Sequence, residues 1–206
     1  AEVKTLIEAF ANIECEVYNS LEDKASHKVE PMKKDMYVAR VQGGKSERKS
    51  INQEIKLPSA LPSCQKVLSC TATVNVDSIH PSSDSIAVFS TVNFNVSYVS
   101  ESNSEPVSFY QPIEIRDVIE CDDTAEDSIC RIRAQVGKSV CTPVADNFGE
   151  NRMFSLETSY TLNALVMENI EESFVTDLYG VGCIAESESE SGRFSRFVGS
   201  LTESTP

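Results

Sequence analysis

Apolar and polar residues alternate over residues 86–98, the most regular stretch of the chain. Every second residue of this stretch, counted from Ile86, is apolar except Ser90, and the residues between them are mostly polar. Because successive side chains point to opposite faces of a strand, this pattern predicts a long β-strand that buries one face. The apolar positions are Ile86, Val88, Val92, Phe94, Val96 and Tyr98.

Similar alternation recurs along the chain between turns rich in Pro, Ser and Asp, and no segment has a convincing helical pattern. Regular short strands and turns are typical of sandwiches and barrels. We therefore expect an all-β protein with a single β-sandwich, Ig-like or jelly-roll-like, over residues 51–180. Its other predicted strands cover residues 51–57, 66–79, 107–113, 130–140 and 154–166.

The two ends are expected to extend from this sandwich. Residues 1–50 are predicted to form an N-terminal arm and a basic loop region. In the arm, Leu6, Phe10, Ile13 and Val17 have helical spacing, whereas Ile13, Cys15 and Val17 have strand spacing. We expect an extended arm that becomes a strand near residue 11, and these four apolar residues are its candidate interface.

Two further segments lack strand alternation. Residues 19–50 are polar and contain Gly43-Gly44, so we expect a long loop or hairpin there. Residues 181–206 are expected to form an acidic, Ser-rich tail, with a solvated run at 186–190. The short apolar motif at 194–201 either docks on another subunit or covers an open edge of its own sheet.

The net charge is −14, and all of the acidic excess follows residue 60. An acidic body repels phosphate backbones, so we expect no nucleic-acid partner. No apolar run is long enough to span a bilayer, and the first residues lack the features of a secretory signal. Residues 24–49 lean basic; they are either a solvated loop or an arm attracted to the acidic body of a neighbouring copy.

Seven cysteines leave several pairings open. No two have C-x-x-C spacing, which argues against structural zinc. Cys121 and Cys130 flank a polar connector, and a disulfide between them would contribute about 2–3 kcal/mol by closing that loop. The alternative is that the cysteines are buried free thiols. Cys15 and Cys183, near the termini, are the candidates for bonds between chains, and Cys64, Cys70 and Cys141 stay unassigned.

The sequence gives little support for a catalytic site. A Ser–His–Asp arrangement would need His27 or His80, which lie in a charged segment and beside a proline in a turn. The acidic pairs 122–123 and 126–127 lack the ligand spacing of a calcium loop, and no phosphate-binding glycine loop occurs. We expect no enzymatic activity, no cofactor and no metal.

Several landmarks over about residues 51–180 occur in the order seen in one known family. The chain resembles the SPOCS-type domain of spore coat assembly proteins. The landmarks are Ile55-Lys-Leu-Pro58, Pro62, Val67-Leu-Ser69, the strand Ala87–Tyr98, Val107-Ser-Phe109 with Pro112-Ile113, and Val175-Thr-Asp-Leu-Tyr179.

This resemblance implies a non-enzymatic protein of the bacterial spore surface, in the coat, the exosporium or an appendage. Our first expectation is a subunit that assembles head to tail with copies of itself, through strand exchange by terminal arms and disulfides between subunits. The alternative is an adaptor that docks another coat morphogenetic protein, as one family member does. A weaker alternative is a secreted Ig-like adhesion domain.

Overall fold

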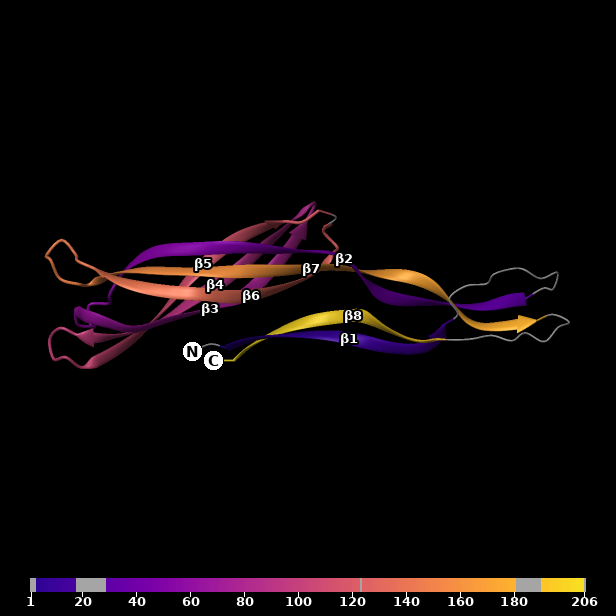
Figure 1. The fold of residues 1–206 in the computed structure, drawn as a ribbon, viewed down its shortest axis with the longest axis horizontal. Helices are drawn as coiled ribbons and strands as arrows, with labels where there is room; N and C mark the ends of the chain where they lie inside the picture. Colours follow the sequence, from indigo (N-terminus) through magenta and orange to yellow (C-terminus); the bar gives the residue numbers. More distant parts are fainter. Residues whose placement is uncertain (1–2, 18–28, 123, 181–189, 206) are drawn as a thin grey trace. The chain divides into compact units, whose positions relative to one another are not determined.

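All of the regular structure in the part of the chain described is β-strand, as expected from the sequence. The computed structural model describes residues 3–17, 29–122, 124–180 and 190–205. The strands are β1 (Val3–Val17), β2 (Val29–Lys56), β3 (Cys64–Ser82), β4 (Ser85–Ser100), β5 (Pro106–Glu120), β6 (Ile129–Val144), β7 (Met153–Gly180) and β8 (Glu190–Thr205) (Figure 1).

Contacts between residues divide the chain into two compact units. One unit is Gln42–Val166, and the other combines Ala1–Val41 with Met167–Pro206. The long strands β2 and β7 contribute residues to both units. The predicted boundaries at residues 50 and 180 came from composition and stay a prediction.

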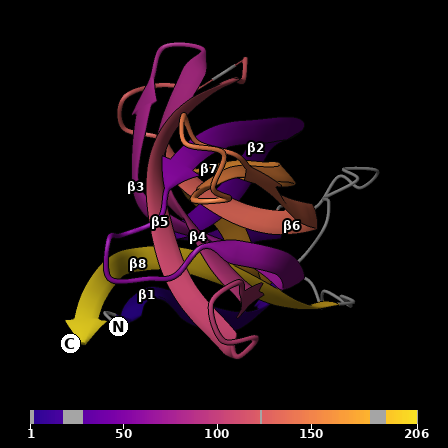
Figure 2. The ribbon, with the colours of Figure 1, turned by 90° about the vertical axis from the view of Figure 1, so that its left-hand side faces the viewer.

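The unit Gln42–Val166 is a β-sandwich. One sheet has the order β3-β4-β5 and the other has the order β2-β7-β6, so β4 and β7 are the central strands. Figure 2 shows the two sheets as separate layers. Antiparallel pairing follows from the register, in which Ser85 lies opposite Glu120 and Val99 opposite Pro106. The predicted all-β sandwich is confirmed.

The sandwich core forms where the apolar face of β4 packs against the apolar face of β7. Val92, Phe94 and Val96 are buried in one cluster with Phe154 and Leu156. A second cluster places Ile86 and Val88 of β4 against Tyr160, Leu162 and Val166 of β7. The core side chains of both strands therefore have the period of two that the sequence shows.

Aromatic rings fill the end of the core near the end of β4. The ring of Tyr98 lies 5.6 Å from that of Phe154 and 6.1 Å from that of Phe109, measured between centroids. The Tyr98 hydroxyl donates a hydrogen bond to the Pro62 carbonyl at 2.8 Å, which satisfies the buried polar end of the side chain.

The other unit contains a two-stranded antiparallel sheet of β1 and β8, here called the terminal ribbon. Its register pairs Val3 with Thr205 and Val17 with Glu190, and it shifts once between Ala9 and Phe10. Two contacts join the ribbon to β7. The Phe194 ring lies 4.6 Å from that of Phe174, and the Asn169 side chain bonds both the N–H and the carbonyl of Phe197.

The ends contain strands that the sequence did not predict. Residues 29–50, part of the segment 19–50 that was expected to include a long loop or hairpin, continue into the predicted strand at 51–56 as the single strand β2, and Gly43-Gly44 lies inside it. Residues 190–205, expected in a tail, form β8. In both cases the strand has a polar sequence, and its pairing with β7 or β1 supplies the stabilisation that local alternation does not reveal. The expected solvated run falls mostly outside the described residues.

Candidate interaction sites

Three of the cysteines left unassigned by the sequence meet in the core of the sandwich. Cys64 and Cys141 are buried in one cluster with β4 and β7 residues, and Cys70 packs against that cluster. Burial raises the pKa of the Cys141 thiol to about 12, and the nearby sulfurs of Cys70 and Cys64 add to the effect. Buried protonated thiols are poor nucleophiles, so these residues act as small apolar side chains.

Cys121 and Cys130 lie at the ends of the acidic connector and belong to the second core cluster. Both are free thiols in the structure, so the predicted bridge is not formed in it; this pairing stays a prediction. Burial raises the pKa of Cys130 to about 11, with a further contribution from the nearby Cys121 sulfur.

The candidate cross-link between chains involves the two ends. Cys15 lies in β1, opposite Gly192 of β8 in the ribbon register. Cys183 lies outside the described residues. A bond between copies through these two residues is therefore a prediction.

The candidate arm residues Leu6, Phe10, Ile13 and Val17 all lie in β1, which is a strand along its whole length and not only after residue 11. Phe10 contacts Phe197 of β8 edge to face, with 5.5 Å between ring centroids. Ile13 lies opposite Phe194. The arm is thus paired with the C-terminal strand of the same chain, a partner that the sequence did not reveal.

The sandwich covers its own strand edges. β3 and β6, the edge strands of opposite sheets, lie beside each other. On the other side, the Lys49 ammonium of β2 donates to the Val118 carbonyl of β5 at 3.2 Å, and the Glu47 carboxylate accepts a hydrogen bond from the Glu120 backbone. β5 also contains Pro112, which has no N–H to offer a further strand. These features hinder strand addition to the sandwich.

The terminal ribbon lacks such cover. Among the described strands, β1 and β8 pair only with each other, so each has one unpaired edge. Neither contains proline. The side chain of Asn169 occupies one point of the β8 edge, at Phe197. Among the described strands, the outer edges of β1 and β8 are therefore without a pairing strand.

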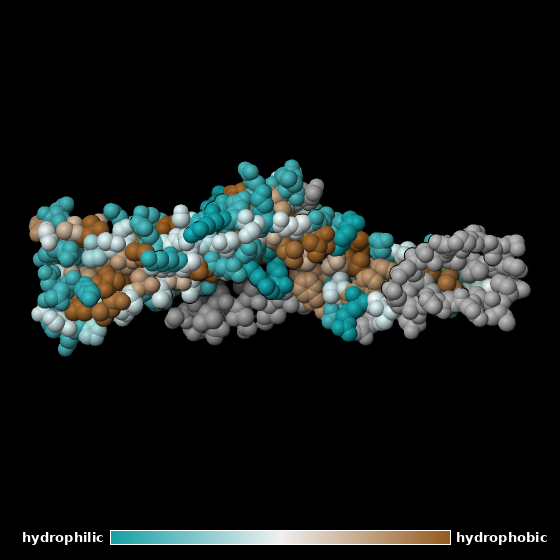
Figure 3. Space-filling view, in the orientation of Figure 1, coloured by the Kyte–Doolittle hydropathy of each residue, from teal (hydrophilic) through white to brown (hydrophobic). Residues whose placement is uncertain are grey.

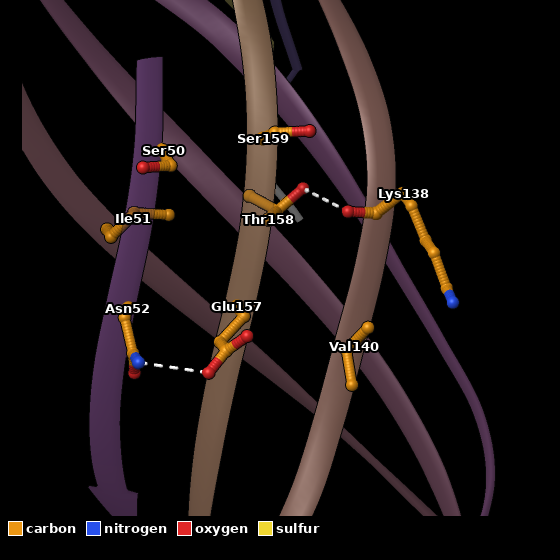
Figure 4. A pocket seen from close by; sticks show the side chains of 8 residues that line it. All are labelled: Ser50, Ile51, Asn52, Lys138, Val140, Glu157, Thr158 and Ser159. Carbon is orange, nitrogen blue, oxygen red and sulfur yellow. Dashed lines mark hydrogen bonds between the residues drawn. The ribbon is translucent and has the colours of Figure 1, made fainter.

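The outer face of the β2-β7-β6 sheet is hollowed. A depression of about 360 Å³ lies over the middle of the three strands (Figure 4). Within its lining, Glu157 accepts a hydrogen bond from the Asn52 amide at 2.9 Å. A second hollow of about 230 Å³ shares Ser159 with the first and is lined by Arg48 and Gly137. The first is lined by Ser50, Ile51, Asn52, Lys138, Val140, Glu157, Thr158 and Ser159.

Large apolar side chains are also exposed. On the face seen in Figure 3 they form several separate patches among hydrophilic residues. Most exposed apolar residues lie on strands, but Phe148 lies in the β6–β7 turn and is the most exposed of all those described. Scattered apolar residues are normal on a protein surface, so exposure alone does not mark an interaction site.

The part of the chain described offers no group of three or more His, Cys, Asp or Glu residues that could hold a metal ion. His80 packs edge to face against Phe89, with 5.5 Å between ring centroids. His27 lies outside the described residues. The described residues also include no helix with the length and apolarity to cross a bilayer. The expectations of no enzyme, cofactor or metal stay predictions.

Comparison with known proteins supports the resemblance found in the sequence. Residues 63–143 match the family model described as SipL, SPOCS domain. The chain therefore carries a SPOCS-type segment. It runs from β3 through most of β6 and so includes the whole β3-β4-β5 sheet. No curated protein and no solved structure matches the chain. The SPOCS match suggests a protein related to spores.

Proposed function

We propose that this protein is a non-enzymatic structural subunit of the bacterial spore surface, in the coat, the exosporium or an appendage. Copies assemble head to tail when β1 of one copy pairs with β8 of the next. The observation that carries this proposal is the terminal ribbon, in which the two ends of the chain pair with each other and with no third described strand.

The geometry of the ribbon suits exchange between copies. A two-stranded sheet alone is only marginally stable in water, and β1 makes its strand pairing entirely with β8. A β1 strand from a second copy has the same sequence and can make the same pairing, so exchange loses no contact within the ribbon. A contact of this kind from one copy to the next joins two different surfaces, and it extends as a filament when the rotation between copies does not close a ring.

A cross-link across the ribbon distinguishes pairing within a chain from pairing between chains. Asn12 and Ser195 lie directly opposite each other, with the Ser195 hydroxyl donating to the side-chain amide oxygen of Asn12 at 3.1 Å. Opposed antiparallel residues have Cα atoms about 4.5–5.5 Å apart, which is within disulfide range. We therefore mix the Asn12→Cys variant with the Ser195→Cys variant in the presence of a small disulfide oxidant.

If β1 is exchanged, the mixture forms a disulfide-linked heterodimer that peptide mapping locates at positions 12 and 195. The control replaces the second variant with Ser191→Cys, which is four residues and about 13 Å out of register. A bridge that forms equally well with the control, or a mixture that stays monomeric under every oxidising condition, argues against exchange.

Deletion of residues 1–17 tests the same proposal without cysteines. We expect a soluble, folded protein that no longer polymerises, because the sandwich core contains no β1 residue. Negative-stain microscopy and sedimentation compare it with the full chain. Phe10→Ala, which removes the ring contact with Phe197, should weaken assembly.

Covalent locking through Cys15 and Cys183 is the second part of the proposal. Mass spectrometry with and without reductant should show covalent ladders that collapse on reduction. Bridges confined to one chain would instead support a discrete domain. A stoichiometric partner from the spore coat, recovered without any self-assembly at high concentration, would favour an adaptor.

A further inference from the structure

The turn between β6 and β7 is held in one conformation by its own hydrogen bonds. The Asp146 N–H donates to the Glu150 carbonyl at 2.8 Å, and the Gly149 N–H donates to the Asp146 carbonyl at 3.0 Å. The Asp146 carboxylate accepts from the N–H groups of Phe148 and Glu150 at 2.9 and 3.1 Å. Gly149 has φ of +82°, which a residue with a side chain rarely adopts.

This turn presents Phe148 to solvent. The residue is 91% exposed, whereas the next most exposed large apolar residue is 59% exposed. A side chain on an ordered turn loses little conformational entropy when it binds, and buried aromatic anchors carry much of the energy of protein interfaces. Phe148 is therefore the apolar residue best placed to enter a pocket on another molecule.

The outer hollow of the β2-β7-β6 sheet has the chemistry to receive it. Val140 of β6 lines the hollow and is 37% exposed. Lys138 lines it as well, and Arg48 lines the adjoining smaller hollow. Figure 4 shows Val140 and Lys138 together on β6, with Glu157 on β7 and Asn52 on β2 bonded to each other. The hollow thus combines apolar surface with the cation Lys138 and the Glu157 carboxylate, which is bonded to Asn52, and a second cation, Arg48, lines the adjoining hollow.

We propose that the Phe148 turn of one copy docks into this hollow of a second copy. The charges match, because Asp146 and Glu150 flank the aromatic ring and Lys138 and Arg48 border the receiving surface. The two surfaces are different, so each copy donates a turn and offers a hollow, and the contact repeats without closing. The inference rests on the proposed self-assembly and gives the sandwich a second contact in it.

Two variants of the full chain remove one half of the contact each. Phe148→Ala removes the ring, and Val140→Trp fills the hollow from an exposed strand position that tolerates an aromatic side chain. In sedimentation velocity over a concentration series, each variant alone should associate about tenfold more weakly than the natural chain, as expected for a central aromatic contact. Leu68→Ala and Val118→Trp make matched changes at exposed positions of the other sheet.

Mixing the two variants gives the decisive result. The Phe148→Ala chain keeps its hollow and the Val140→Trp chain keeps its turn, so the mixture should form heterodimers that neither variant forms alone. In the same way Lys138→Glu and Glu150→Lys should each weaken association, and a mixture of these two variants should recover it. Association of Phe148→Ala within about twofold of the natural chain, or equal losses in the matched controls, overturns the proposal.

The docking contact of Phe148 and the strand exchange of β1 can be tested separately. The Asn12→Cys and Ser195→Cys bridge should form as before in chains that also carry Phe148→Ala. If the bridge forms but Phe148→Ala has no effect, only the docking contact is wrong. If association depends on Phe148 but the bridge never forms between chains, only strand exchange is wrong. A natural chain that stays monomeric in both measurements overturns both.

Discussion

Ser90 is a polar residue in the middle of the buried face of β4, and replacing it by alanine should stabilise the protein. The residue is 1% exposed, and its hydroxyl oxygen has no hydrogen-bond partner. On β4 it lies between Val88 and Val92 of the core and opposite Ile115 of β5. Folding therefore removes this hydroxyl from water and gives no hydrogen bond in return.

The magnitude follows from two opposing effects. A buried hydroxyl without a partner costs about 1–3 kcal/mol relative to water. Ser90→Ala removes that cost and leaves a void smaller than one methylene group, so part of the gain is lost to packing. We expect a net increase in the free energy of unfolding of about 1 kcal/mol, which corresponds to about 2–4 °C in melting temperature for a chain of this size.

The assay is urea unfolding followed by circular dichroism, together with a thermal scan. Ser97→Ala is the matched control, because Ser97 lies on the opposite face of the same strand and its hydroxyl bonds that of Ser108 at 2.7 Å. The control should be neutral or slightly destabilising. Equal or lower stability of Ser90→Ala would refute the argument and would mean that the hydroxyl gains an interaction inside the core.

Three other changes should reduce stability for identifiable reasons. Tyr160→Phe should cost about 1.5–3 kcal/mol in urea unfolding, because the hydroxyl donates to the Asp117 carboxylate at 2.8 Å in the core. Gly137→Ala should lower the melting temperature, because a Cβ there would lie 2.7 Å from the Ser159 hydroxyl and 3.1 Å from its carbonyl oxygen. Stability should fall as pH rises from about 9 towards 12, because native Cys141, with its pKa raised to about 12, keeps a proton that the unfolded chain loses. Cys141→Ala should show a smaller fall in the urea midpoint over that range.

The interior of the sandwich was largely predictable from the sequence. Residues 86–98 and 154–166 alternate with few exceptions, and they lie in the central strands β4 and β7. A central strand buries one whole face, so its sequence must alternate, and that requirement is local. The exception at Ser90 was visible in the pattern, but its missing hydrogen bond was not, since a partner could have come from any strand.

The interaction sites were less predictable. The spacing of Cys64, Cys70 and Cys141 along the sequence does not predict that they lie together. They meet in the core because β3 and β6 lie beside each other. The hollow draws its lining from the consecutive strands β6 and β7 and from β2, which lies far from them in sequence. Phe148 had a local signal, an aromatic residue between turn formers at 146–150, but only the structure reveals that it is exposed.

By itself the sequence determined the central strands of the sandwich, which of their side chains face the core and the acidic character of the body, because each depends on residues close together in the chain. The tertiary structure alone decided that β1 pairs with β8, that β2 is one continuous strand and that the thiols cluster. A strand that pairs through its backbone places few demands on its side chains. Its partner is therefore chosen by the rest of the fold, and the local pattern does not reveal it.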